Sequence, residues 1–183
     1  MKKIIDLIKT LLSNPVFTFG FIAFISFTAL AMAMSSEAFF GLEPCNLCIY
    51  QRYPFLFGII LGISGLLLRK KEKVSRLLLG IIGINFLVNS GIAFYHTGVE
   101  QKWWVSAFEG CKVPLFFDDT SEQSILENLM SAPMSSCSDI QWQDPIIGLS
   151  MANYNVMLCF GLFVFSMLGA YLLKTSQAPS KNQ

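Results

Sequence analysis

The stretch that decides the fold is residues 53–95, YPFLFGIILGISGLLLRKKEKVSRLLLGIIGINFLVNSGIAFY. Two uncharged runs, 53–68 and 77–95, are joined by a short connection that carries five basic residues. A helix needs about 20 apolar residues to cross the hydrocarbon core of a bilayer. The stretch therefore predicts two membrane-spanning helices with a basic turn, residues 69–76, between them.

Two further uncharged runs, residues 10–36 and 145–173, flank this pair. The first run is too long for the apolar region of a signal peptide, so we expect it to be retained as a span. The chain is 54% hydrophobic and only 14% charged, which is not typical of a soluble domain. We predict an all-α membrane protein, a four-transmembrane-helix bundle over residues 1–173 followed by a polar tail, 174–183. The predicted spans are about 15–36, 45–68, 77–96 and 145–173.

The charges orient this bundle. Ten of the 13 Lys and Arg residues lie in the amino terminus, the 69–76 turn and the tail, whereas segments 37–52 and 96–144 together hold three. By the positive-inside rule, both termini and the turn are cytoplasmic, and the loops 37–44 and 97–144 face outward. The net charge of +1 gives no basic field for nucleic acid, so no such partner is predicted.

The cysteines follow the same division. Four of the five lie in or beside the outer loops: Cys45, Cys48, Cys111 and Cys137. Disulfides persist outside the reducing cytosol, so this placement predicts an oxidising compartment. Cys159 falls in the middle of the last span, where we expect it to pack as a small apolar residue.

The Cys45-x-x-Cys48 pair suits three kinds of site: a structural disulfide, half of a four-cysteine zinc site, or a redox centre. The other two cysteines do not form a second closely spaced pair, which disfavours zinc, and so short a disulfide loop adds little stability. Pro44 opens the second span and Arg52 lies one turn after Cys48, so a helix dipole and a fixed positive charge would both favour thiolate. The redox interpretation is favoured, with no metal.

Cys111 and Cys137 enclose a wide loop. Residues 121–130 within it have apolar side chains at helical spacing, which predicts a short amphipathic helix lying at the membrane surface. The loop has two interpretations. It is a stapled loop with an interfacial anchor, or it offers a mobile disulfide to the thiolate of a partner protein.

Arg52 and His96, the only histidine, end at the outer boundary of neighbouring spans. Each has an ordinary interpretation, since an interfacial arginine can extend to lipid headgroups and a lone histidine is more often a simple interfacial residue. Together, however, they would bracket a polar oxygen acceptor whose apolar tail runs into the bilayer. A membrane quinone has that shape.

Three stretches resemble the DsbB family of disulfide bond formation proteins: EPCNLCIYQRYPF (43–55), AFYHTGVEQKWW (93–104) and CSDIQWQDPIIGLSMANYN (137–155). The resemblance extends over about residues 15–173. It implies a multi-pass thiol oxidase of the bacterial inner membrane with its active cysteines on the periplasmic side. Such an enzyme reoxidises a soluble thioredoxin-fold, DsbA-like oxidase and passes the electrons to ubiquinone or menaquinone.

The same resemblance implies roles for individual residues. Cys111 would form the mixed disulfide with the partner, and Cys137 would be its leaving group. Cys45 and Cys48 would reoxidise that loop pair, with Cys48 facing the quinone. Arg52 would stabilise negative charge on the quinone or the thiolate, and His96 would be a further quinone-pocket residue. This sequence departs from the pattern at Gln51, where other members can carry an acid.

Two rival interpretations remain. One is a protein similar to vitamin K epoxide reductase, another quinone-linked four-helix redox bundle, but its active pair is expected near the final helix. The other is a non-enzymatic scaffold whose outer loop is stapled by disulfides. The scaffold leaves the Cys-x-x-Cys spacing and the adjacent Arg52 without an explanation.

Overall fold

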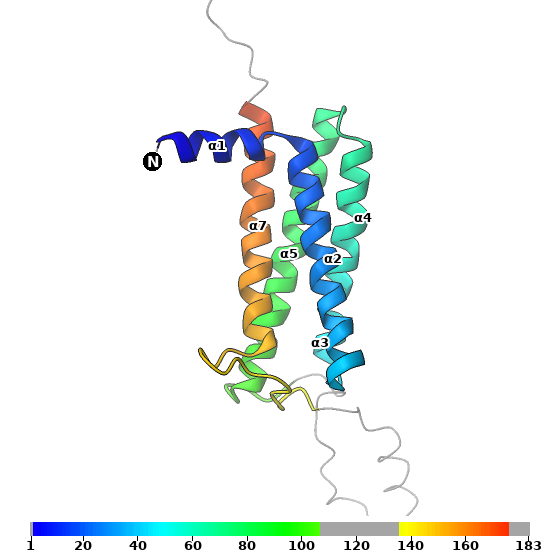
Figure 1. Cartoon of the computed structure of the whole chain (residues 1–183), viewed down its shortest axis with the longest axis vertical. Helices are drawn as coiled ribbons and strands as arrows, with labels where there is room; N and C mark the ends of the chain where they lie inside the picture. Colours follow the sequence, from blue (N-terminus) through cyan, green and yellow to red (C-terminus); the bar gives the residue numbers. More distant parts are fainter. Residues whose placement is uncertain (1, 107–135, 176–183) are drawn as a thin grey trace, which may run out of the picture.

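The computed structural model describes residues 2–106 and 136–175. Four long helices run side by side as a bundle (Figure 1). They are α2 (Pro15–Phe40), α4 (Tyr53–Leu67), α5 (Glu72–Glu100) and α7 (Met151–Thr175). A short helix, α3 (Asn46–Tyr50), precedes α4, and together they form one of four segments long and apolar enough to span a membrane. The predicted four-helix membrane bundle is confirmed.

The bundle core lies between aromatic and branched side chains of all four helices. Phe19 and Ile22 of α2, Leu79 and Phe86 of α5, and Leu162 of α7 are buried in one cluster. Other large apolar residues, such as Phe24 at 65% exposure, point outward. An apolar exterior is what a lipid environment requires, because the bilayer core offers no hydrogen-bonding partners for polar groups.

Helix α1 (Lys2–Leu12) was not predicted; the sequence suggested only a basic flank. It lies across one end of the bundle, transverse to the long helices (Figure 1). Asn14 ends this segment and caps α2, since its Oδ1 accepts the main-chain N–H of Val16 at 2.9 Å. Pro15 at the first position of α2 then fixes the change in direction.

The second predicted span, 45–68, is divided into α3 and α4. Pro54 stands in the first turn of α4 and has no N–H, so the hydrogen-bond ladder of α3 cannot continue through it. The chain instead tightens at Gln51 and Arg52, whose main-chain N–H groups donate to Leu47 and Ile49. Cys48 therefore lies in α3, whereas Arg52 lies in the turn between α3 and α4, although the two are only four positions apart in the sequence.

The last helix begins at Met151, six residues later than the predicted 145. Asp144 Oδ1 accepts the main-chain N–H groups of Ile146 and Ile147 at 2.8 and 3.0 Å, and Gly148 has φ 73°, so the chain turns before the helix starts. These N–H donors lower the pKa of the Asp144 carboxyl. The predicted surface helix at 121–130 and Cys111 lie outside the described residues.

Candidate active site

The Cys45–Cys48 pair lies at the end of the bundle opposite α1. Cys45 is the N-cap of α3, and its sulfur accepts the main-chain N–H of Cys48 at 3.3 Å. The two sulfur atoms are 2.8 Å apart, and both residues are free thiols. Cys45 is buried, whereas Cys48 is half-buried. The structure therefore holds the two thiols in contact, with one more accessible than the other.

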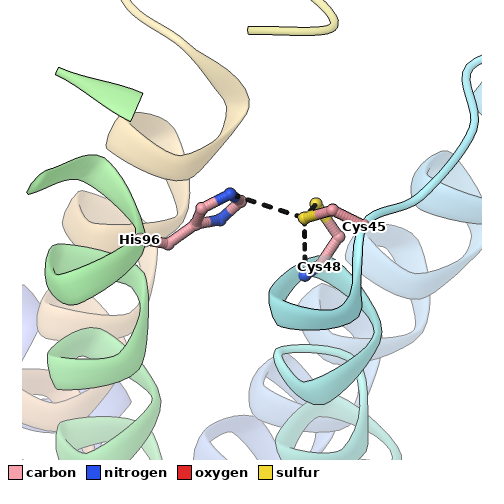
Figure 2. A group of neighbouring side chains, drawn as sticks. All are labelled: Cys45, Cys48 and His96. Carbon is pink, nitrogen blue, oxygen red and sulfur yellow. Dashed lines mark hydrogen bonds between the residues drawn. The ribbon is translucent and has the colours of Figure 1, made fainter. Parts of the chain in front are cut away.

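His96 approaches this pair from α5 (Figure 2). Its Nε2 lies 3.5 Å from the sulfur of Cys45, and the imidazole is only 3% exposed. Helix α5 continues one turn past His96 to Glu100, whose Oε1 is 3.7 Å from the same Nε2. The hydroxyl of Ser150 donates to the other oxygen of this carboxylate at 2.5 Å. Cys45, His96 and Glu100 thus form a buried polar row.

These contacts set the charge of Cys45. Its pKa is lowered to about 4, first because the Cys48 thiol donates to the sulfur and also through His96, while burial acts in the opposite direction. These contacts favour the thiolate form of Cys45 at neutral pH. The sequence suggested a helix dipole and Arg52 as the causes. The main-chain N–H of Cys48, in the first turn of α3, does contribute to lowering the pKa of Cys45, whereas Arg52 is paired with Glu37 instead.

Arg52 forms an ion pair with Glu37, near the end of α2. Both side chains are partly exposed, at 22% and 29%. Nothing in the sequence indicated Glu37 as a partner, because the pairing depends on how α2 packs against α4. Arg52 lies at the dithiol end of the bundle, and the carboxylate of Glu37 balances its charge there.

Cys137 is brought to the dithiol. It is disulfide-bonded and fully buried, in a cluster with Cys45, Leu47 and Val99. Cys137, in the segment that precedes α7, therefore lies over the dithiol end of the bundle. Three of the four predicted catalytic cysteines lie together in the described part of the chain, while Cys111 lies outside it.

An open apolar pocket of about 630 Å³ lies next to this cluster. Helices α3 and α4 form one wall and α5 the other; the lining residues are Leu47, Tyr50, Tyr53, Pro54, Val88, Gly91, Ile92 and Tyr95. Leu47, Ile92 and Tyr95 also pack in the cluster that contains the dithiol. The volume is in the range of small-molecule sites, and the three tyrosine rings suit a flat, largely apolar ligand.

The ligand atoms of Cys45, Cys48 and His96 all lie within 4.8 Å of one another, so a metal ion is a possible occupant. Two thiolates on tetrahedral zinc, with bonds of about 2.3 Å, stand about 3.7 Å apart. The sulfur atoms here are 2.8 Å apart, closer than such a site requires. The arrangement suits formation of a sulfur–sulfur bond better than zinc binding.

Four polar residues of the site were missed or undervalued in the sequence. Asn89, Asn155 and Glu100 were not singled out, and Gln51 was noted only as a departure from a family pattern. Gln51 and Glu100 contact the imidazole of His96, and Asn89 and Asn155 are hydrogen-bonded to Gln51. Their signal was present, because polar side chains inside apolar spans are costly and are usually functional. Cys159, expected only to pack, is buried and hydrogen-bonded to Asn89 and Asn155.

Comparison with known proteins identifies the family of this chain. The model of the family "Disulfide bond formation protein DsbB" matches residues 15–169. Disulfide bond formation protein B of Xanthomonas axonopodis pv. citri is 27% identical over 162 residues, which cover 87% of this chain and 91% of the relative. Uncharacterized protein RP370 of Rickettsia prowazekii is 29% identical over 153 residues, covering 84% and 86%. This multi-pass membrane chain belongs to the DsbB family of disulfide bond formation proteins.

Proposed function

We propose that the protein is a dithiol:quinone oxidoreductase that reoxidises a periplasmic, thioredoxin-fold oxidase. The observation that carries the proposal is the packing of Cys137 against the Cys45–Cys48 dithiol. Thiol–disulfide exchange needs sulfur atoms that can approach one another. A disulfide-bonded residue of the second loop buried beside a second dithiol supplies that approach.

The electron path follows from the chemistry of the two pairs. A partner thiolate attacks the Cys111–Cys137 disulfide, and its second thiol completes the exchange, so the partner leaves oxidised and the loop pair is reduced. A loop thiolate then attacks the Cys45–Cys48 disulfide, which reoxidises the loop and leaves the inner pair as one thiolate and one thiol. Each exchange breaks one S–S bond and forms another, and two electrons move inward.

The final acceptor would occupy the tyrosine-lined pocket. A bound quinone supplies the oxidising equivalent, because it takes up two electrons and two protons to become a quinol. Leu47, Ile92 and Tyr95 would hold it beside Cys48, while the apolar wall of α4 and α5 would receive its tail. Arg52 would provide positive charge at the same end of the bundle. The residue roles assigned to Arg52 and His96 belong to this proposal.

The same proposal places the protein in the bacterial inner membrane with the dithiol end in the periplasm. The support is the distribution of basic residues, of which ten of 13 lie at the other end of the bundle or in the tail. Basic residues are enriched on the cytoplasmic side of membrane proteins, where they also interact with anionic lipid headgroups.

The direct test is turnover by the purified full-length protein in detergent. A reduced thioredoxin-fold dithiol oxidase is added with a soluble quinone, and quinone absorbance is followed. We expect reduction by the intact protein and loss of at least 1,000-fold with Cys45→Ser or Cys48→Ser, since each removes a reacting sulfur. Thermal unfolding of each variant controls for folding. Turnover that survives either substitution would refute the proposal.

Redox activity, zinc content and the position of the cysteines separate the rival interpretations from the proposed oxidase. The scaffold interpretation predicts no redox defect in the two serine variants. A zinc site predicts stoichiometric zinc in protein purified without chelator, and loss of that zinc in Cys45→Ser. A vitamin K epoxide reductase-like arrangement requires an active pair near the last helix, where the sequence has only Cys159.

A further inference from the structure

A chain of hydrogen bonds connects His96 to α7 on the side away from Cys45. The Nε2 of Gln51 lies 3.0 Å from His96 Nδ1. Asn155 Nδ2 donates to Gln51 Oε1 at 2.6 Å, and the Cys159 thiol donates to Asn155 Oδ1 at 3.2 Å. The chain thus runs from α7, through the turn between α3 and α4, to the imidazole.

Asn89 fixes the direction of this chain. Its Nδ2 donates to the main-chain carbonyl of Gln51 at 3.2 Å, and a carbonyl oxygen can only accept. The same nitrogen donates to the Cys159 sulfur at 3.2 Å. The sulfur already accepts there, so its S–H is free to donate to Asn155 Oδ1. The amide nitrogen of Asn155 then faces Gln51 Oε1, and the amide nitrogen of Gln51 faces His96.

An amide nitrogen cannot accept a hydrogen bond, so His96 Nδ1 must be the acceptor. The single proton of a neutral imidazole then sits on Nε2, the nitrogen that faces the sulfur of Cys45 and the carboxylate of Glu100. We propose that Gln51 and Asn155 are positioning residues that hold the His96 proton on Nε2, directed at the Cys45 sulfur. The importance of this proton position for turnover rests on the proposed oxidase function.

A fixed Nε2–H would stabilise thiolate at Cys45, because it presents a hydrogen-bond donor to the buried sulfur. The lowered pKa of Cys45 agrees with a donor at this position. Among the described residues, the titratable groups acting on this sulfur are Cys48 of α3 and His96 and Glu100 of α5.

Because His96 is the only histidine, histidine labelled with ¹⁵N gives one pair of ring-nitrogen signals from the full-length protein. The ¹⁵N shift of a ring nitrogen differs strongly between its protonated and unprotonated forms. In the reduced wild-type protein at neutral pH, we expect a protonated Nε2 and an unprotonated Nδ1. A wild-type spectrum with the proton on Nδ1 would overturn the proposal without any variant.

Gln51→Glu provides the second arm, because a carboxylate accepts where the amide donates. We expect the proton to appear on Nδ1 in this variant, and a mixture of tautomers in Asn155→Leu, where the Gln51 amide is free to rotate. Gln101→Glu is the matched control: it adds the same charge at an exposed position five residues after His96 and should leave the spectrum unchanged. An unchanged spectrum in Gln51→Glu would contradict the proposal.

Reactivity of Cys45 gives a readout that a purely structural role would not move. In Gln51→Leu, the pH midpoint of Cys45 alkylation should rise by up to about one unit, the value of one lost hydrogen bond to the thiolate. No rise would contradict the proposal. Both readouts need neither quinone nor partner, so a failed oxidase assay with the predicted spectra would refute the proposed function and leave the tautomer assignment intact.

Discussion

At the scale of single residues, the charge on the Cys45 sulfur depends first on its neighbour in the pair. The largest cause of its lowered pKa is the hydrogen bond from the Cys48 thiol. Cys48→Ala removes that donor, so the pKa of Cys45 should rise toward the ordinary thiol value. Cys48→Ser keeps a donor and should shift it less. The rate of iodoacetamide modification against pH, resolved by residue with mass spectrometry, measures both; identical profiles for the two variants would be inconsistent with this cause.

The same lowered pKa has a consequence for stability. A thiol that ionises near 4 in the folded protein, and near 9.0 ordinarily, favours the folded state when it is ionised. This contribution is complete above 9.0 and decreases as the pH falls toward about 4. Reduced protein should therefore lose thermal stability on acidification across that window. Cys45→Ser should lose less, and an equal loss in both would exclude Cys45 as the cause.

Substitutions of Arg52 and of Glu37 should have different effects on the KM for quinone, although the two residues form an ion pair in the structure. If Arg52 holds the quinone, Arg52→Gln should raise the KM for quinone by about tenfold or more, the value of a hydrogen bond from a charged group. Glu37→Gln leaves that charge unopposed and should leave KM no higher. Its cost in stability should be below about 1 kcal/mol, because the pair is partly exposed. Equal rises in KM would indicate that the ion pair, and not Arg52 alone, is required.

At the scale of elements, α4 approaches α2 through glycines. A Cβ built on Gly65 would overlap the ring of Phe19, and one on Gly62 would lie 2.9 Å from Ala23 Cβ. Small residues allow such close approach between membrane helices. Gly65→Ala should cost about 1 to 3 kcal/mol, because the buried ring of Phe19 must move.

Thermal unfolding in detergent measures this cost, with Gly80→Ala as the matched control. A Cβ on Gly80 meets nothing within 4 Å, so that variant should be as stable as the parent or slightly more stable. If the two alanine variants unfold at the same temperature, α2 and α4 do not pack as closely as the structure indicates.

The number of spans could be predicted from the sequence, but the exact ends of the helices could not. Runs without charge predicted four spans, because the bilayer imposes a minimum apolar length. The break before Pro54 and the late start of α7 at Met151 depend on single hydrogen bonds, which apolar length does not report. Helix α1 was not predicted, because the basic residues of this segment were used only to assign the orientation of the bundle.

At the scale of the whole molecule, the site combines residues that are distant in sequence. Cys45, His96, Cys137 and Asn155 come from four segments and meet at one end of the bundle. Residue type predicted the thiols, Arg52 and His96, because each stands out in an apolar chain. The partners Glu37, Glu100 and Asn155 required knowledge of which helix faces lie together, and a single sequence does not contain it.

Orientation in the membrane is the remaining property of the whole molecule, and it decides whether the dithiol end faces the periplasm. A membrane-impermeant maleimide tests it in intact bacterial cells. Val105→Cys lies at the dithiol end and is 87% exposed in the parent, whereas Lys71→Cys lies in the exposed basic turn at the other end. The unsubstituted parent protein gives the background from its own cysteines. Because ten of 13 basic residues lie at the Lys71 end or in the tail, we expect Val105→Cys to be labelled in intact cells and Lys71→Cys only after permeabilisation. The opposite pattern would place the thiols in the reducing cytosol, where a stable disulfide at Cys137 and an oxidase role would both fail.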